Sequence, residues 1–127
     1  GDVTAQTIFI NAKSQDREKL ENRELKREIA ALMRAMIESE IGKYYVISNM
    51  RELKKTKDML VVQEKTYRYK GLVGAVVRAT NLSKVELEIT EQDLMFKSII
   101  AINIGNRFIA PKTSQLIFVI TRGDDAS

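Results

Sequence analysis

Three carboxylates that lie close together are the first candidates for chemistry: Glu88, Glu91 and Asp93. Clustered oxygen ligands can hold a divalent cation, and paired carboxylates can transfer protons. Residues 84–90 alternate strictly between polar and apolar, so we predict a strand whose Glu88 points to solvent and whose Val85, Leu87 and Ile89 face the core. Glu91 and Asp93 then fall just past the strand. We therefore expect a solvated acidic turn and no metal site.

The sequence contains neither histidine nor cysteine. Histidine titrates near neutral pH and is the commonest general base and metal ligand. Without these two residues, Ser-His and Cys-His nucleophiles, thiolate metal sites and disulfides are excluded. A carboxylate pair, a lysine or a magnesium site stays formally open. Because no acidic pocket is recognisable, we expect a protein that is not an enzyme, with no catalytic residues, no metal and no cofactor.

Two short motifs also give no support for chemistry. Gly71-Leu72-Val73-Gly74 lacks the glycine spacing, the Lys-Ser/Thr pair and the following helix of a phosphate-binding loop. Asn81-Leu82-Ser83 matches the N-glycosylation pattern. Its place between two predicted strands indicates a turn first of all.

The middle of the chain is basic, because residues 41–80 hold nine basic side chains against three acidic ones. Such a block can bind nucleic acid, anionic lipid or an acidic protein surface, or it can be a solvated connector and the outer face of a strand. Tyr67 and Tyr69 can stack on bases, but no nucleic-acid-binding motif surrounds them. We favour the solvated interpretation and expect no specific binding of nucleic acid.

One amphipathic helix is predicted near residues 23–41. Its apolar residues are spaced by four, three and four positions, which places them on one helix face: Leu25, Ile29, Leu32 and Met36. Helix-forming residues fill the rest of this segment. Asn22 is expected to cap its start, and Gly42 is expected to follow its end.

The other apolar and alternating runs predict short strands, separated by turns rich in Gly, Asn and Ser: residues 3–12, 43–47, 59–69, 72–80, 84–90, 98–104, 108–111 and 115–121. Residues 48–58 are polar and are expected to form a loop. We infer a mostly β protein with a single domain over residues 1–127, an antiparallel β-sandwich with one amphipathic helix packed on it. No apolar run approaches the ~20 residues that span a bilayer, so we expect no direct membrane insertion.

Three stretches of the chain follow one another in a recognisable order. The helix and its exit read Leu32-Met33-Arg34-Ala35-Met36 and then Gly42-Lys43-Tyr44-Tyr45-Val46. The middle reads Ala79-Thr80-Asn81-Leu82-Ser83, then Val85-Glu86-Leu87 and Glu91-Gln92-Asp93-Leu94. The end reads Phe108-Ile109-Ala110-Pro111 and then Leu116-Ile117-Phe118-Val119-Ile120. Over nearly its whole length the chain resembles the C-terminal domain of the TraK family, secretin-like periplasmic proteins of F-type conjugative type IV secretion systems.

The resemblance implies a structural subunit of the outer-membrane core complex, located in the periplasm and associated with the outer membrane. The implied partners are an outer-membrane lipoprotein (TraV-like), a spanning channel protein (TraB-like) and neighbouring copies in a homo-oligomeric ring. It implies no enzymatic activity and no cofactor, and it implies that a β domain precedes this segment. The alternative is a free-standing β-sandwich binding module that recognises carbohydrate or nucleic acid.

Two predicted strands are candidates for binding a partner by strand addition, residues 3–12 and residues 59–69. An open sheet has edge strands with unpaired backbone groups, and an extended segment of a lipoprotein can pair with such an edge. We expect Ile8, Ile10, Tyr67 or Tyr69 to anchor that segment. For Ile8 and Ile10 ordinary core packing is the competing interpretation.

Overall fold

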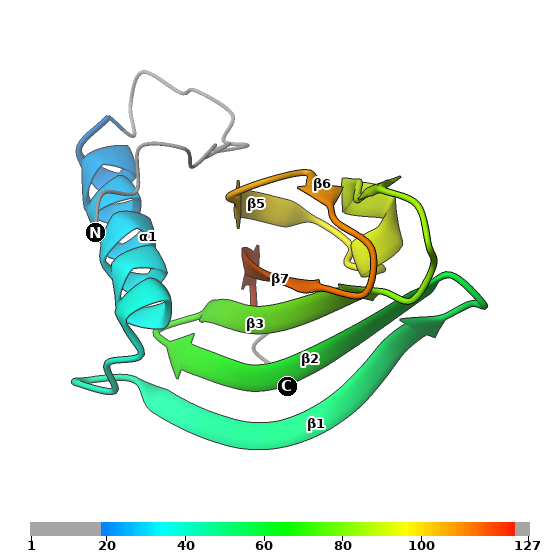
Figure 1. Ribbon diagram of the computed structural model, residues 1–127. Coiled ribbons are helices and arrows are strands. Elements are labelled where there is room, and N and C mark those ends of the chain that lie inside the picture. Colours follow the sequence, from blue (N-terminus) through cyan, green and yellow to red (C-terminus); the bar gives the residue numbers. More distant parts are fainter. Residues whose placement is uncertain (1–18, 124–127) are drawn as a thin grey trace.

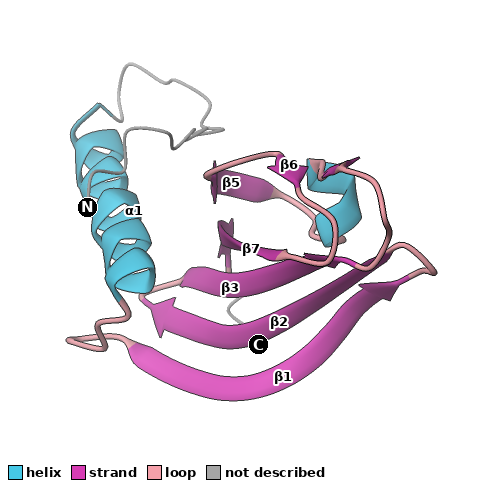
Figure 2. Cartoon of the chain, viewed as in Figure 1, coloured by secondary structure: helices cyan, strands magenta, loops and turns pink. Residues whose placement is uncertain are grey.

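Figure 1 shows a computed structural model of the chain, which describes residues 19–123. One α-helix, α1 (Lys19–Glu38), precedes the strands, and η2 (Glu91–Leu94) is a single turn of 3-10 helix. The strands are β1 (Tyr45–Lys55), β2 (Met59–Tyr69), β3 (Leu72–Asn81), β4 (Leu87–Glu88), β5 (Ile99–Ile104), β6 (Phe108–Ile109) and β7 (Ser114–Arg122). The predicted mostly β class with one packed helix is confirmed (Figure 2). The strand predicted at residues 3–12 lies outside the described residues.

Five strands form one antiparallel sheet in the order β1-β2-β3-β7-β5, and β4 pairs with β6 in a second, small sheet. The large sheet buries its two faces against different elements. On the α1 face, the helix packs near one end of the sheet, and Leu32 and Phe118 belong to the core there (Figure 1). On the opposite face, called here the η2 face, Leu94 and Ile117 belong to a second core.

The apolar stripe of α1 is buried as predicted, but the helix ends differ from the prediction. α1 begins before Asn22, which therefore lies inside the helix and is not its N-cap, because helix-forming residues precede it. At the other end Ser39 has a φ of 58°. Its N–H donates to the Met36 carbonyl at 3.3 Å, and the next N–H donates to the Ala35 carbonyl at 2.8 Å. These bonds form a Schellman cap, so Ser39 takes the place predicted for Gly42.

Gly74 allows α1 to lie close to β3. A Cβ atom at this position would lie 2.6 Å from Met36 Sδ and 3.4 Å from Leu32 Cδ1. Both of those side chains are buried in the core on the α1 face. A glycine in the strand interior thus removes the side chain that would hold the helix away from the sheet.

β2 contains one extra residue relative to β3, because the register of the pair shifts between Gln63 and Lys65. Side chains alternate between the faces of a sheet, so one extra residue reverses the face that the following residues meet. Before the shift Met59 and Val61 belong to the core on the η2 face, and after it Tyr67 belongs to the core on the α1 face. β2 therefore supplies apolar side chains to both cores.

The prediction of a loop at residues 48–58 is wrong for residues 48–55, which belong to β1. The strand is continuous from Tyr45 to Lys55, although only residues 43–47 are predicted to be extended. Most of its side chains are exposed on both faces of the sheet. An edge strand of this kind has no apolar alternation, so the sequence pattern could not reveal it.

The strand predicted at residues 84–90 is reduced to the two residues of β4. Ile89 is buried as expected, but Val85 is 63% exposed. The reason is Asn81, whose side-chain amide donates to the Val85 carbonyl at 2.7 Å and to the Ile109 carbonyl at 2.9 Å. Its side-chain oxygen accepts a hydrogen bond from the Ser83 N–H at 2.8 Å. These bonds hold the segment before β4 in a turn.

Replacing Gly74 with valine should destabilise the domain, because the larger side chain has to fit between α1 and β3. Overpacking of this kind costs about 1–3 kcal/mol of unfolding free energy. Gly105→Val is the matched control, since the nearest atom to its added Cβ is Gln115 Nε2 at 3.4 Å. Chemical denaturation measures both variants. Equal stability of the two would contradict the close approach of α1 to β3.

Candidate partner-binding edge

β1 forms one edge of the large sheet and, within residues 19–123, pairs only with β2. An edge strand presents a row of backbone N–H and C=O groups that no neighbouring strand satisfies. The opposite edge, β5, has six residues, and its last four side chains are buried. β1 has 11 residues, most of them exposed. It is thus the longer and more accessible edge (Figure 1).

Exposed apolar side chains gather on β1 and just before it. Of the seven large hydrophobic side chains exposed in the described part of the chain, four lie within ten residues: Ile41, Tyr45, Ile47 and Met50. Tyr45 is 66% exposed and Met50 is 73% exposed. Val46 packs against the core on the α1 face, so its neighbours Tyr45 and Ile47 point to the η2 face. Aromatic residues and methionine are enriched at protein interfaces, so this cluster makes β1 the candidate interaction surface.

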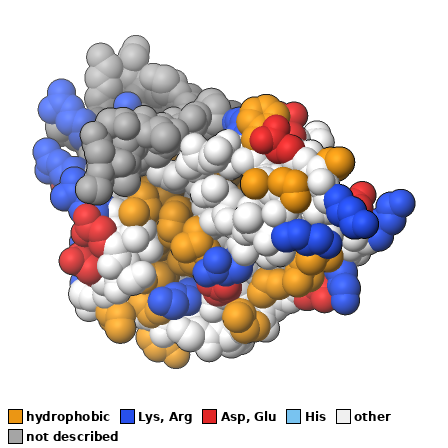
Figure 3. Space-filling model, in the orientation of Figure 1, with side chains coloured by type: hydrophobic (Ala, Val, Ile, Leu, Met, Phe, Trp, Pro, Cys, Tyr) orange, Lys and Arg blue, Asp and Glu red, His pale blue; other side chains and the backbone are white. Residues whose placement is uncertain are grey.

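The second half of β1 is charged. Lys54 Nζ donates to Asp93 Oδ1 at 2.5 Å, so this lysine is already paired. Arg51 and Lys55 are exposed and form no ion pair with any other described residue. Figure 3 shows orange apolar side chains along the lower rim, over β1, and blue side chains at the right, near the turn between β1 and β2.

Two features of β1 also fit an edge that is protected from aggregation. Its register with β2 is irregular between Ser48 and Arg51 and again between Glu52 and Lys54. Bulges and lysines on an edge strand are common devices against unwanted pairing. Exposed tyrosine, isoleucine and methionine side chains do not protect an edge strand against unwanted pairing, so we favour the interpretation of β1 as a binding edge.

The structure does not bring the predicted anchors to an edge. β2 lies between β1 and β3, so both of its sides are paired and it cannot accept an added strand. Tyr67 is 1% exposed and serves the core, and Tyr69 is partly buried against the same core. The expectation that residues 59–69 form a binding edge was therefore wrong, since alternation does not tell which strand is outermost. Ile8 and Ile10 lie outside the described residues.

Tyr67 and Tyr69 instead form an aromatic cluster with Tyr44. The ring centroid of Tyr44 lies 6.1 Å from that of Tyr67 and 5.5 Å from that of Tyr69. Lys43 Nζ lies 4.4 Å from the ring centroid of Tyr69 and donates to Glu28 Oε1 at 3.1 Å. Burial raises the pKa of Tyr44 and of Tyr67, and the hydrogen bond to Glu28 raises the pKa of Lys43. The cluster joins α1 to the start of β1, which positions the candidate edge.

The three acidic residues singled out in the sequence differ in their exposure and in their bonds. Glu88 and Glu91 are exposed, and no cluster of metal-ligating side chains occurs among residues 19–123. Asp93 Oδ2 accepts hydrogen bonds from the Thr90 N–H at 2.9 Å and the Thr90 hydroxyl at 3.1 Å, which caps η2. Burial acts to raise the pKa of Asp93, but the bonds from Lys54 and Thr90 together hold this pKa below its ordinary value.

The basic side chains of residues 41–80 are divided between the two faces of the sheet. Arg51 and Arg68 point to the η2 face, whereas Lys55 and Lys65 point to the α1 face. Others are used in ion pairs, and Arg78 Nε contacts Glu64 Oε2 at 2.6 Å. This distribution does not produce the single basic stripe that is typical of a nucleic-acid-binding surface. The absence of specific nucleic-acid binding stays a prediction.

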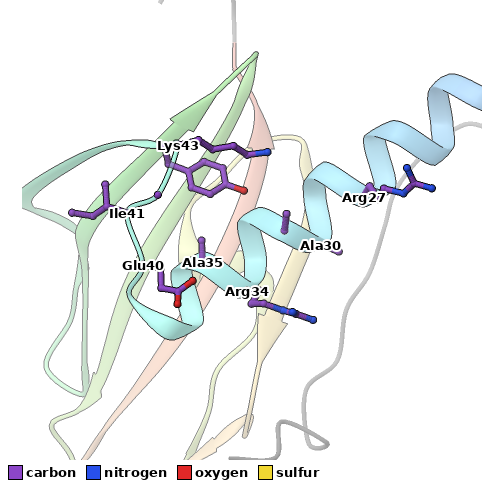
Figure 4. A pocket seen from close by; sticks show the side chains of 10 residues that line it. Arg27, Ala30, Arg34, Ala35, Glu40, Ile41 and Lys43 are labelled. Carbon is purple, nitrogen blue, oxygen red and sulfur yellow. The ribbon is translucent and has the colours of Figure 1, made fainter.

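A groove of about 460 Å³ lies between α1 and the connection to β1 (Figure 4). Its helical lining combines small and basic residues: Arg27, Ala30, Ala31, Arg34 and Ala35. Glu40 and Lys43 line it from the connection, and Lys43 is already bonded to Glu28. Ala35 is buried in the core on the α1 face, whereas Ala30, Ala31 and the two arginines are exposed, as on a solvated helix face, so we assign no ligand to this groove.

No model of a known protein family matches the sequence, and no curated protein shows significant similarity to it. Within residues 19–123, no helix combines the length and the apolar character needed to cross a membrane.

Replacing Asp93 with asparagine should lower stability at neutral pH, because the variant loses the charge that pairs with Lys54. A hydrogen bond to a charged group contributes about 1.5–3 kcal/mol. The folded-state pKa of Asp93 is lowered, so its contribution is present above the unfolded pKa of about 3.9 and is lost as pH falls through the folded pKa.

Denaturation of the wild-type protein and the Asp93→Asn variant between pH 7 and pH 2.5 measures this contribution, with the exposed neighbour Glu91→Gln as the control. The difference in unfolding free energy should shrink toward the acid end. A difference that stays constant over this range would mean that the charge of Asp93 contributes nothing.

Proposed function

We propose that this chain is a structural subunit of the outer-membrane core complex of a conjugative type IV secretion system, where it binds a partner lipoprotein and neighbouring subunits. The observation that carries the binding role is the 11-residue edge of β1 with exposed Tyr45, Ile47 and Met50. The resemblance to the TraK family supports the setting, which is the periplasm beside the outer membrane. The spanning channel protein is the second expected partner.

Strand addition is the binding mode that this edge supports best. An extended segment that pairs with β1 satisfies the backbone groups on its outer side, and alternate side chains then contact Tyr45 and Ile47 on the η2 face. A lipoprotein tail that is extended before binding can pair in this way without rearranging the sheet. The sheet is anchored behind β1 by the buried side chains of β2 and β3, so the edge is held in place before binding.

The alternative, a β-sandwich module that recognises carbohydrate or nucleic acid, has less support. Its strongest sequence argument was the basic block with Tyr67 and Tyr69 as stacking residues. Tyr67 is buried, and the basic side chains are divided between both faces. Tyr45 is the exposed aromatic residue on β1, and it lies beside apolar Ile47 on the same face.

A capture experiment with the 127-residue chain tests the proposal. The immobilised protein is incubated with detergent-solubilised membranes of the source organism, and bound proteins are identified by mass spectrometry. We expect a lipoprotein and a large spanning protein, both encoded beside the gene for this chain. Tyr45→Lys combined with Met50→Lys should reduce their capture at least tenfold, because the change replaces two exposed apolar side chains of the edge with charged ones.

Val85→Lys combined with Met95→Lys is the matched control, because both side chains are exposed and lie outside β1. Thermal unfolding checks that both double variants fold. Equal capture by the two double variants would exclude β1 as the binding site. Capture of proteins without any link to DNA transfer would overturn the secretion-system assignment.

A further inference from the structure

β5 is the second edge of the large sheet, and within residues 19–123 it pairs with β7 alone. In an antiparallel pair, alternate N–H and C=O groups of an edge strand point away from its partner. Ile100 and Ala101 of β5 contribute to the core on the α1 face. Ile102 and Ile104 belong to the core on the η2 face. A strand beside β5 borders both cores, so it has to be apolar on both of its faces.

The strand predicted at residues 3–12 has the composition that this position requires. It contains no charged side chain, and in an extended conformation Phe9 points to one face while Ile8 and Ile10 point to the other. Strands that are covered on both faces typically have such a run of apolar residues. The other end of the 127-residue chain does not fit, because residues 124–127 are too few and include two aspartates.

The direction of α1 brings this segment to the β5 side of the sheet. α1 has 20 residues, so its two ends are about 30 Å apart. The Glu38 end leads into β1, whereas Figure 1 shows the N-terminal end, drawn in blue, at the level of β5. Leu25 from the first part of α1 packs against the same core as Ile100 of β5, which agrees with this view. Residues 13–18 join the predicted strand to Lys19 and can span roughly 20 Å.

We propose that residues 3–12 pair with β5 of the same chain, as a sixth strand of the large sheet. A segment on a short tether has an effective concentration in the millimolar range, so a free strand of similar affinity does not displace it. The closure of β5 is independent of the proposed binding role of β1. It leaves β1 as the edge of the sheet that is open to another protein.

The pairing with β5 is expected to be antiparallel. All four strand pairs described in the large sheet are antiparallel. Ile99 is at the end of β5 that lies toward α1, because the next two residues contribute to the core on the α1 face. An antiparallel segment places Ala12 beside Ile99 and needs only a short connection to α1. A parallel segment would place Ala12 beside Ile104, about 17 Å further along the strand.

Amide hydrogen exchange of the 127-residue chain, followed by NMR, tests the pairing. All amides of Ile99–Ile104 should exchange slowly, including those that point away from β7. Ile8→Lys combined with Ile10→Lys should speed the exchange of these outward amides at least about tenfold, because a charged side chain is costly to bury in a core. Ser14→Lys combined with Gln15→Lys adds the same charge to the connecting residues and is the matched control. Fast exchange of the outward amides in the wild-type protein, or equal exchange in the two double variants, would overturn the pairing.

Nitroxide labels test the direction, and they keep the proposal testable if the double lysine variant does not fold. Because the chain has no cysteine, Thr4→Cys and Asn11→Cys each create a single labelling site. The label at position 11 should broaden the NMR signals near Ile99 more than those near Ile104, and the label at position 4 should do the reverse. The opposite result would overturn the antiparallel direction. Labels that leave all signals of β5 sharp would overturn the pairing itself.

A mixed sample distinguishes the same chain from a second copy as the source of the added strand. Isotope-labelled protein without nitroxide is combined with nitroxide-labelled protein without isotope, and we expect no broadening of the β5 signals. Broadening in this mixture would show that a second copy donates its residues 3–12, and it would overturn pairing within one chain. Capture by the variant Tyr45→Lys with Met50→Lys reports on β1 alone, so a failure of the proposed function is distinguishable from a failure at β5.

Discussion

The large sheet has to bury opposite faces at its two ends, and an extra residue in β2 makes this possible. Four apolar side chains of β2 stand at odd-numbered positions and would face one side of a regular strand: Met59, Val61, Tyr67 and Tyr69. The register shift at Glu64 divides them, so that two meet the core on the η2 face and two meet α1. The long curved sheet can therefore carry α1 on one face and the small β4–β6 layer on the other (Figure 1).

The exposure of the outermost strand, β1, follows from the same arrangement. β1 stays paired along nearly all of β2, and its own register shifts accommodate the change of face. The two cores end at β2, apart from Val46 and Leu53, which reach them from β1. Most of the remaining side chains of β1 are exposed, with the uncharged residues 45–49 at one end and Arg51, Glu52 and Lys55 at the other. The proposed binding surface is thus a consequence of how the sheet is built, and it requires no pocket.

How much the sequence predicts depends on burial. Strong burial made α1, β3 and β7 predictable. In α1, Leu32 and its neighbours at helical spacing face the core, and in β3 and β7 most of the apolar residues face one of the two cores. β1 has little burial and hence no pattern, so its extent was missed. Alternation in β2 indicated a strand correctly but could not show that Tyr67 is interior, because the order of strands in a sheet is not encoded in local periodicity. Val85 was misplaced because the hydrogen bonds of Asn81 outweigh an alternating pattern.

Amide hydrogen exchange of the chain, alone and bound to the captured lipoprotein, tests most directly whether β1 is the binding edge. An added strand forms hydrogen bonds with the backbone groups that point away from β2. We expect new protection at alternate amides between Tyr45 and Lys55, with little change in β3 and β7, which are already paired on both sides. Protection that appears on α1 or around the groove at Arg34, with β1 unchanged, would contradict the assignment of β1 as the binding edge.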